Sequence, residues 1–361
     1  MVSAEQVLDA LRFVKDPEIG RDIVSLNMVQ DLKCGAGKVS FTYILTTPAC
    51  PMKDQMEKEA KEALLKLDGV REVEIKMSSN VARDVRLDQV LPEGVKNVIA
   101  VGSGKGGVGK STVACNIAVA LAMEGSKVGL MDTDVYGPNQ PQMLGLMDKT
   151  VTTDAEGKII PPEKYGVKLM SMGFLIDGDT PVVWRGPMLH GVVTQFFRDV
   201  RWGDIDYLIV DLPPGTGDVQ LTLCQSVPLL GAVIVTTPQS IALSDVKKAV
   251  AMFQKLRVSI LGVVENMSGF FCPHCGRESR IFSSGGGNSL VQKYETQLLG
   301  QIPVHADVCD TGECGKPIVF SMPEHPVSRA FRETARKIAA QVSLANVRAG
   351  QKPKTITIQK V

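Results

Sequence analysis

The sequence lacks several features that would each indicate a class of function. It contains no run of roughly 18 or more apolar residues, so we expect no membrane-spanning helix. Lys plus Arg number 40 against 39 Asp plus Glu, and this net charge of +1 excludes a strongly basic nucleic-acid-binding protein. The segment Met1–Gln6 has no basic stretch followed by an apolar one. We therefore expect no signal peptide and a cytoplasmic protein.

Aromatic residues are scarce, at 5% of the chain, whereas glycine is plentiful, with 34 residues. The glycines stand beside apolar runs, which predicts tight turns and close backbone approaches rather than disorder. The chain also has eight cysteines. Without a secretion signal they argue against a disulfide scaffold, because paired cysteines in a reducing cytosol more often bind metal or carry redox chemistry.

The pattern of the chain changes near residue 96. Residues 1–80 predict a small α+β domain, and the polar residues 81–95 favour a linker. Residues 96–345 form the second expected domain, and a polar tail covers 346–361. The expected helices cover 4–14, 52–67 and 327–345, and the expected strands of the small domain cover 38–45 and 70–77.

The second domain alternates short apolar runs with helical patterns. The runs cover 97–101, 127–131, 207–210, 232–236 and 260–264. Short buried strands between helices predict an α/β fold, with a mostly parallel sheet covered by helices on both faces. Ligands of such folds bind at the carboxyl ends of the strands, so chemically active residues are expected directly after each run.

A phosphate-binding loop follows the first run. Residues 104–111, Gly-Lys-Gly-Gly-Val-Gly-Lys-Ser, match the pattern G-x-x-x-x-G-K-[ST] between a strand and a helix. We expect Lys110 to contact the β and γ phosphates of ATP and the Ser111 hydroxyl to hold Mg²⁺. The expected nucleotide-binding residues of this loop are Gly104, Lys105, Gly106, Gly107, Val108, Gly109, Lys110, Ser111 and Thr112.

Polar residues follow three further apolar runs. Asp132 and Asp134 follow the second run, and we expect Asp134 to activate water with Asp132 in support. Asp211 follows four apolar residues, as in a Walker B motif, and precedes Leu-Pro-Pro-Gly-Thr-Gly, a candidate switch segment. The amide of Asn266 is a candidate contact to the adenine edge, and a turn asparagine is an equally good interpretation.

Cys272 and Cys275 form the single C-x-x-C motif of the chain. Two thiolates fill only half of a tetrahedral Zn²⁺ site or of a [4Fe–4S] ligand set. Either Cys309 and Cys314 complete the set, or a second subunit supplies the other pair across a two-fold axis. His274, which lies between the two motif cysteines, is an alternative ligand.

Cys50 stands directly before a predicted helix of the first domain. A helix N-terminus lowers a thiol pKa, so Cys50 is a candidate reactive thiolate or accessory metal ligand, with a small buried cap residue as the alternative. Cys34, Cys115 and Cys224 are expected to be buried.

Lys105, the second lysine of the loop, marks a deviant Walker A motif. This loop resembles that of the ATPases that include the nitrogenase iron protein and the cell-division and plasmid-partition ATPases. The resemblance implies that Lys105 reaches the nucleotide of a partner subunit. The whole pattern resembles the Mrp/ApbC family of iron–sulfur cluster carrier ATPases with an N-terminal iron–sulfur-assembly-type domain. The segments that carry this resemblance are 16–18, 46–51, 102–111, 132–138, 184–187, 211–218, 265–268 and 272–275.

The resemblance implies a homodimer that binds and hydrolyses ATP through Lys105, Lys110, Asp134 and Asp211. It also implies a labile [4Fe–4S] cluster held between two Cys272/Cys275 pairs, received from an iron–sulfur donor and passed to apoproteins. The family usually has Ala where this chain has Thr133, and we expect this difference to be without consequence.

Three other functions are weighed against the carrier. A zinc-stabilised NTPase would use Cys272 and Cys275 structurally, and an electron-transfer reductase would keep its cluster permanently. A positioning ATPase that acts on membrane or DNA needs an amphipathic C-terminal helix or a basic surface. Residues 351–361 contain Pro353 and lack helical amphipathic spacing, so we expect no membrane and no nucleic-acid partner.

Overall fold

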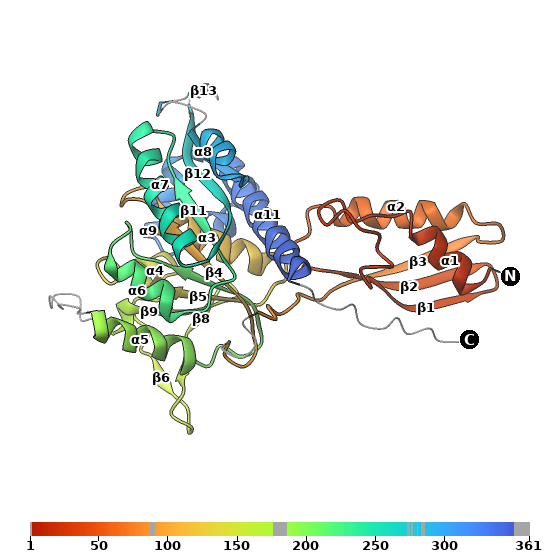
Figure 1. Cartoon of the computed structure of the whole chain (residues 1–361), viewed down its shortest axis with the longest axis horizontal. Helices are drawn as coiled ribbons and strands as arrows, with labels where there is room; N and C mark the ends of the chain where they lie inside the picture. Colours follow the sequence, from red (N-terminus) through yellow and green to blue (C-terminus); the bar gives the residue numbers. More distant parts are fainter. Residues whose placement is uncertain are drawn as a thin grey trace. The chain divides into compact units, whose positions relative to one another are not determined.

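The computed structural model describes residues 2–86, 91–175, 186–272, 275, 277–279, 281–282 and 286–349. The chain forms two compact units, Met1–Val85 with Ala339–Val361 and Arg86–Ile338 (Figure 1). The boundary between Ile338 and Ala339 falls inside helix α11 (Pro326–Arg348). This helix extends beyond the predicted range of 327–345. The expected tail therefore begins in this helix, and its residues from 350 onward lie outside the described part.

The first unit is built on a three-stranded sheet. Strand β2 (Lys38–Leu45) matches the predicted range and pairs antiparallel with β1 (Val29–Gly35) and parallel with β3 (Glu72–Ser79). Helices α1 (Ala4–Leu11) and α2 (Lys53–Leu65) contact this sheet and bury its apolar side chains. Both helices end before the predicted residue, α1 at Leu11 and α2 at Leu65. The capping box of Ser3 and Gln6 fixes the start of α1 at the predicted position.

The segment expected to be a polar linker contains buried residues. Val81, Asp84 and Leu91 are all buried, and strand β4 (Val95–Ser103) begins where the linker was expected to end. Composition alone suggested a solvated segment, because its few apolar residues are dispersed among charged ones.

The second unit contains a nine-stranded sheet of order β13-β12-β11-β4-β10-β5-β9-β8, with β14 also paired to β12. Only the pairs β12–β13 and β8–β9 are antiparallel. The remaining strands are β5 (Val128–Asp132), β8 (Glu163–Lys164), β9 (Val167–Ser171), β10 (Ile205–Asp211), β11 (Gly231–Thr236), β12 (Ser259–Phe271), β13 (Glu278–Ser279) and β14 (Leu298–Val304), with β6 (Thr152–Thr153) and β7 (Ile159–Ile160) in a separate hairpin.

The described helices of this unit pack against the sheet and against one another. They are α3 (Lys110–Met123), α4 (Gln140–Met143), α5 (Gly186–Arg198), α6 (Asp218–Ser226), α7 (Ser240–Lys255), α8 (Gly286–Tyr294), α9 (Ala306–Glu313) and α10 (Ile318–Ser321), with a 3-10 turn at Met172–Phe174. Helix α3 contacts β5 and β10, and α7 contacts β11 and β12. None of the helices within the described ranges is both long and apolar enough to cross a bilayer.

The predicted α/β fold is confirmed. All five apolar runs are strands, and every residue of β5, β10 and β11 is buried, as expected for strands inside a parallel sheet. The register places Asp211 of β10 beside both Asp132 of β5 and Val101 of β4. The carboxyl ends of these three strands therefore meet at one place, and the loop before α3 starts there.

Candidate nucleotide site and cysteine hairpin

The phosphate loop lies between the end of β4 and the start of α3. At two of its glycines, neighbouring atoms leave no room for a side chain. A Cβ on Gly104 would overlap the backbone of Asp245, and a Cβ on Gly109 would overlap the side-chain amide of Asn266. Gly109 also has φ +79°, a left-handed conformation that favours glycine. The shape of the loop thus depends on the absence of side chains at these positions.

Lys110 is the centre of a buried charge cluster. Its Nζ lies 2.5 Å from Asp211 Oδ1 and 3.8 Å from Asp134 Oδ2, and it donates to Ser111 Oγ over 3.1 Å. The side chains of Lys110 and Asp211 are 5% and 1% exposed. The two predicted catalytic carboxylates, Asp134 and Asp211, and the predicted Mg²⁺ ligand Ser111 are therefore brought together around the ammonium group of Lys110.

Asp132 and Asp134 have different environments. Asp132 is fully buried and accepts hydrogen bonds from Ser171 Oγ over 2.8 Å and from the backbone N–H groups of Asp134 and Gln140. Burial and the charge of Asp211 raise the pKa of Asp132 to about 7. Burial also raises the pKa of Asp134, against the opposing effect of Lys110. Asp132 is therefore enclosed by protein donors, whereas Asp134 faces the ammonium group.

Sequence reasoning missed two buried residues of this cluster. Gln140 Nε2 donates to Ser111 O and to Asp211 Oδ2, both over 2.9 Å. Ser171 ends β9, so the strand-end rule applied to that strand is the signal that would have found it. No motif marks Gln140, which reaches the cluster from the short helix α4.

Thr133 makes a contact that alanine, the usual residue of the family that the chain resembles, cannot make. Thr133 is fully buried and its hydroxyl donates to Asp211 O over 2.8 Å. Its backbone N–H donates to the same oxygen over 3.0 Å. Thr133 thus links the end of β5 to the end of β10 through two hydrogen bonds. An alanine at this position would lose the hydroxyl bond and keep the backbone bond.

Strand β12 connects the phosphate loop to the cysteine motif. Asn266 Nδ2 donates to Val108 O of the loop over 2.9 Å, which holds the strand against the loop. The neighbouring Glu265 is buried and accepts from Gly287 N and Gln301 Nε2. The strand then continues to Phe271, directly before Cys272.

The C-x-x-C motif lies in the loop of a β-hairpin. Phe270 and Phe271 of β12 pair with β13, and Cys272 N donates to Arg277 O over 3.0 Å. Cys272 is half-buried and Cys275 is exposed. His274, the alternative ligand, lies outside the described residues, as do residues 184 and 185 of the resemblance. The hairpin presents Cys275 to solvent at the end of the strand that touches the phosphate loop.

The remaining cysteines lie in other parts of the fold. Cys115 and Cys224 are buried as predicted, whereas Cys34 is half-buried because its strand is the edge of a small sheet. Cys309 and Cys314 are exposed, and Cys309 Sγ lies 3.4 Å from Glu313 Oε1. Burial raises the pKa of Cys224 to about 12, which agrees with an inert thiol.

Cys50 is half-buried beside the core of the first unit. Helix α2 begins at Lys53 with Met52 as its N-cap, so Cys50 does not occupy the capping position expected from the sequence. Burial, Asp16 and Cys50 together raise the pKa of the enclosed Tyr43 phenol. The Cys50 thiol therefore lies near the buried Tyr43 hydroxyl.

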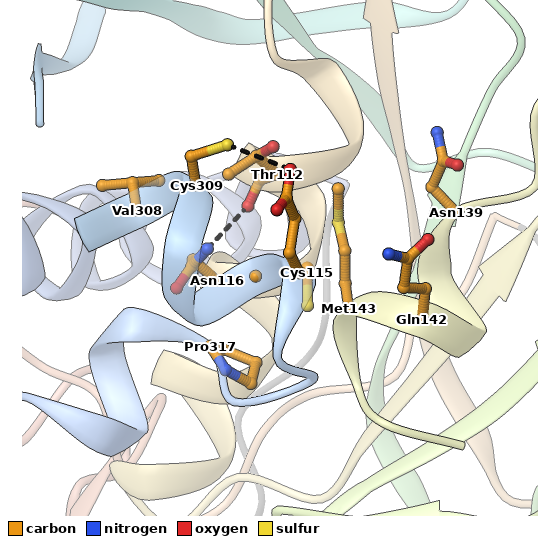
Figure 2. Close-up of a pocket in the computed structure, with 11 residues that line it drawn as sticks. Thr112, Cys115, Asn116, Asn139, Gln142, Met143, Val308, Cys309 and Pro317 are labelled. Atoms are coloured by element: carbon orange, nitrogen blue, oxygen red, sulfur yellow. Dashed lines mark hydrogen bonds between the residues drawn. The ribbon is translucent and has the colours of Figure 1, made fainter. Parts of the chain in front are cut away.

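A cavity of about 240 Å³ opens beside the helix of the phosphate loop. In Figure 2, Thr112 and Asn116 lie beside Cys309 of α9, and Met143, Gln142 and Asn139 lie to their right. Neither Lys110 nor Asp211 lines it. The cavity therefore adjoins the charge cluster without containing it, and of the predicted nucleotide-binding residues only Thr112 belongs to it.

Two family descriptions match the chain. Residues 94–339 match the family described as NUBPL iron-transfer P-loop NTPase, and residues 4–76 match the iron-sulfur cluster assembly protein family. A relative from Synechocystis, named iron-sulfur cluster carrier protein, is 48% identical over 350 residues, covering 96% of this chain and 99% of the relative.

Solved structures resemble about two thirds of the chain. A nucleotide-binding protein from Archaeoglobus fulgidus, solved with ADP, is 39% identical and has a TM-score of 0.56, covering 64% of this chain and 89% of that protein. The cell division ATPase MinD from Pyrococcus furiosus is 26% identical with a TM-score of 0.52, covering 67% of this chain and 98% of that protein.

Proposed function

Because the chain belongs to the family of NUBPL iron-transfer P-loop NTPases, we propose that it is an ATP-hydrolysing carrier of a labile [4Fe–4S] cluster. Two copies hold the cluster between them, receive it from an iron–sulfur donor and pass it to apoproteins. The name of the Synechocystis relative and the match of residues 4–76 support this proposal. A carrier with reduced thiols belongs in a reducing compartment such as the cytoplasm.

One observation carries the proposal. Strand β12 joins the phosphate loop, through the bond from Asn266 to Val108, to the hairpin that holds Cys272 and Cys275. From Asn266 to Cys272 the chain advances by less than about 20 Å, because β12 is irregular between Asn266 and Phe270. A movement of the phosphate loop on nucleotide binding can therefore be transmitted through β12 to the two thiols. Two cysteines per chain supply half of the four thiolates of a [4Fe–4S] cluster, so two copies complete one site.

The charge cluster suggests how ATP acts. Lys110 leaves Asp211 when its ammonium binds the β and γ phosphates, and Asp211 then requires another cation. Ser111 Oγ and Asp211 Oδ1 both lie against Lys110 Nζ, so a hydroxyl and a carboxylate oxygen face one point, which fits the oxygen ligands that Mg²⁺ prefers. Mg²⁺ held at this point would supply positive charge next to the γ phosphate. Asp134, beside Lys110, orients the attacking water.

Anaerobic reconstitution with iron and sulfide tests the cluster. Wild type and Cys272→Ser/Cys275→Ser are compared for iron, sulfide, zinc and mass, with Cys309→Ser/Cys314→Ser as the matched control. We expect about four irons and four sulfides per dimer in wild type and control, and neither in the Cys272/Cys275 variant. Zinc without sulfide at the same cysteines would overturn the proposal in favour of a zinc-stabilised NTPase.

A transfer assay separates a carrier from an electron-transfer reductase. The loaded protein is mixed with an apoprotein acceptor that needs a [4Fe–4S] cluster for activity, and acceptor activation is followed with and without ATP. We expect activation by wild type, with an ATP effect that Lys110→Ala abolishes. A cluster that stays bound while the acceptor remains inactive would contradict the carrier. Transfer by Lys110→Ala at the rate of ATP-treated wild type would contradict the role of ATP.

A further inference from the structure

Two of the four histidines of the chain lie in contact with each other and with one carboxylate. His305 follows β14 and caps the N-terminus of α9, and Asp307 lies in the first turn of that helix. His325 precedes α11, twenty residues along the chain. The two imidazole rings stand edge to face with their centres 4.4 Å apart. The fold thus gathers three metal-type ligands from two separate helix starts.

The distances between the Asp307 carboxylate and the two imidazole nitrogens fit a shared metal ion better than direct hydrogen bonds. Asp307 Oδ2 lies 3.4 Å from His305 Nδ1 and 3.7 Å from His325 Nε2, beyond the usual hydrogen-bond length. One ligand atom from each of the three residues lies within 4.8 Å of the others. Ligand atoms about 2.0 to 2.2 Å from a tetrahedral ion stand roughly 3.3 to 3.6 Å apart. An ion between the three side chains therefore needs only a small contraction of the cluster.

The existing hydrogen bonds of the two rings are long, and an ion would displace them. Both rings accept long backbone bonds at Nδ1, over 3.3 Å from Asp307 N and over 3.2 Å from Val327 N. Ligation at Nδ1 of His305 replaces the first bond. Ligation at Nε2 of His325 requires the tautomer with its proton on Nδ1, so the bond from Val327 N is given up. The side chains are 22%, 35% and 15% exposed for His305, Asp307 and His325, so water has access to the remaining coordination positions.

We propose that His305, Asp307 and His325 form a mononuclear site for a divalent transition-metal cation, independent of the cysteine hairpin. Two imidazoles and one carboxylate suit zinc, cobalt or ferrous iron, with water completing the coordination. Asp307 and His305 begin α9, whose later residues Val308 and Cys309 line the cavity beside α3 (Figure 2). A bound ion therefore fixes the start of the helix that forms one wall of that cavity.

Titration of the metal-free full chain with Co²⁺ tests this site. The background is Cys272→Ser/Cys275→Ser, which removes the hairpin thiolates. We expect one Co²⁺ per chain with visible d–d absorption and no intense thiolate charge-transfer band. Asp307→Asn, which preserves side-chain shape, and His325→Gln should each weaken Co²⁺ binding by about tenfold or more. His190→Ala, which changes an exposed histidine of α5, is the matched control and should bind as the background does.

Circular dichroism of each variant separates loss of a ligand from loss of the fold. Weakened binding by a folded Asp307→Asn chain, with the control unchanged, supports the site. Unchanged Co²⁺ affinity in both folded cluster variants would overturn the proposal, as would a background protein that binds no Co²⁺. Neither result bears on the proposed iron–sulfur carrier, because the cysteines are already absent from the background.

Discussion

At the scale of single residues, the ion pair between Lys110 and Asp211 has two roles. It neutralises a buried carboxylate that stands next to the equally buried Asp132, and it holds the ammonium group where phosphate is expected. Removing one partner of a buried pair leaves an uncompensated charge, which costs far more than removing both. Stability and nucleotide binding are therefore linked through the same lysine.

This linkage predicts the behaviour of three variants. Lys110→Met should lower the free energy of unfolding by about 3 to 5 kcal/mol and abolish nucleotide binding. Lys110→Met/Asp211→Asn should regain most of that stability without regaining nucleotide binding, because the fully buried Asp211 carboxylate no longer stands without its cation. Urea unfolding followed by circular dichroism measures the first effect, and ATP titration measures the second. A double variant no more stable than Lys110→Met would contradict the argument.

Glu18 in the first unit predicts a dependence of stability on pH. Burial and the charge of Asp16 raise the pKa of Glu18 to about 7, above its ordinary value of 4.5. The folded chain therefore binds this proton more tightly than the unfolded chain does. The resulting stabilisation is complete below pH 4.5 and is lost as the pH rises through 7.

Glu18→Gln should flatten this part of the stability profile. As the pH rises, the free energy of unfolding of wild type should decrease more steeply than that of Glu18→Gln. The difference in slope should be less than about 1.4 kcal/mol per pH unit, because solvent screens the charge of a half-buried group. Chemical unfolding between pH 4 and pH 8 provides the measurement, and Glu5→Gln on α1 is an exposed control. Parallel profiles for wild type and Glu18→Gln would show that Glu18 does not retain the proton.

At the scale of elements, local patterns predicted the strands that are buried and uninterrupted. The apolar runs of β4, β5, β10 and β11 are continuous, so periodicity identifies them directly. Strand β14 was missed, because Gly300 and Pro303 interrupt its apolar residues. The site divides in the same way: the glycine loop and Asp211 are marked by motifs, whereas Gln140 and Thr133 act through contacts that only the folded chain creates.

The phosphate loop allows a matched test with two glycines. A Cβ on Gly104 meets the backbone of Asp245 in α7, whereas a Cβ on Gly106 has only Pro214 carbons nearby, at 3.9 and 4.0 Å. Backbone atoms cannot move aside as a flexible side chain can, so Gly104→Ala must displace the loop or α7. We expect Gly104→Ala to weaken ATP binding by at least about tenfold, the cost of roughly 1.4 kcal/mol in loop strain.

Gly106→Ala should bind ATP within about threefold of wild type, since Gly106 is exposed and its φ lies outside the left-handed region. Isothermal titration with ATP and Mg²⁺ compares the two variants. An equal loss of ATP affinity in both variants would contradict the argument. The close approach of Asp245 to Gly104 would then not explain the need for glycine there.

At the scale of the whole molecule, the proposal requires two copies for two separate reasons. The cysteine hairpin supplies only two thiolates per chain, and Lys105 is expected to reach the nucleotide of the partner subunit. Lys105 is half-buried at the start of the loop, and among the described residues its ammonium group makes no ion pair. This leaves its charge available for a nucleotide that the same chain does not bind.

A mixture of two inactive variants tests this arrangement. Lys105→Gln binds ATP but gives no lysine to the partner site, whereas Lys110→Ala keeps Lys105 but binds no ATP. Each variant alone should hydrolyse ATP at least about a hundredfold more slowly than wild type, by analogy with other charges supplied across an interface.

An equal mixture should regain activity, because in the mixed dimer the Lys110→Ala chain supplies Lys105 to the nucleotide held by the Lys105→Gln chain. Half of the dimers are mixed and each has one working site, so the mixture should reach about a quarter of wild-type activity. ATP hydrolysis measured across mixing ratios should peak near equal amounts. A mixture no more active than its components would mean that Lys105 acts within its own chain. The number of cysteines per chain would then be the one remaining argument for a dimer.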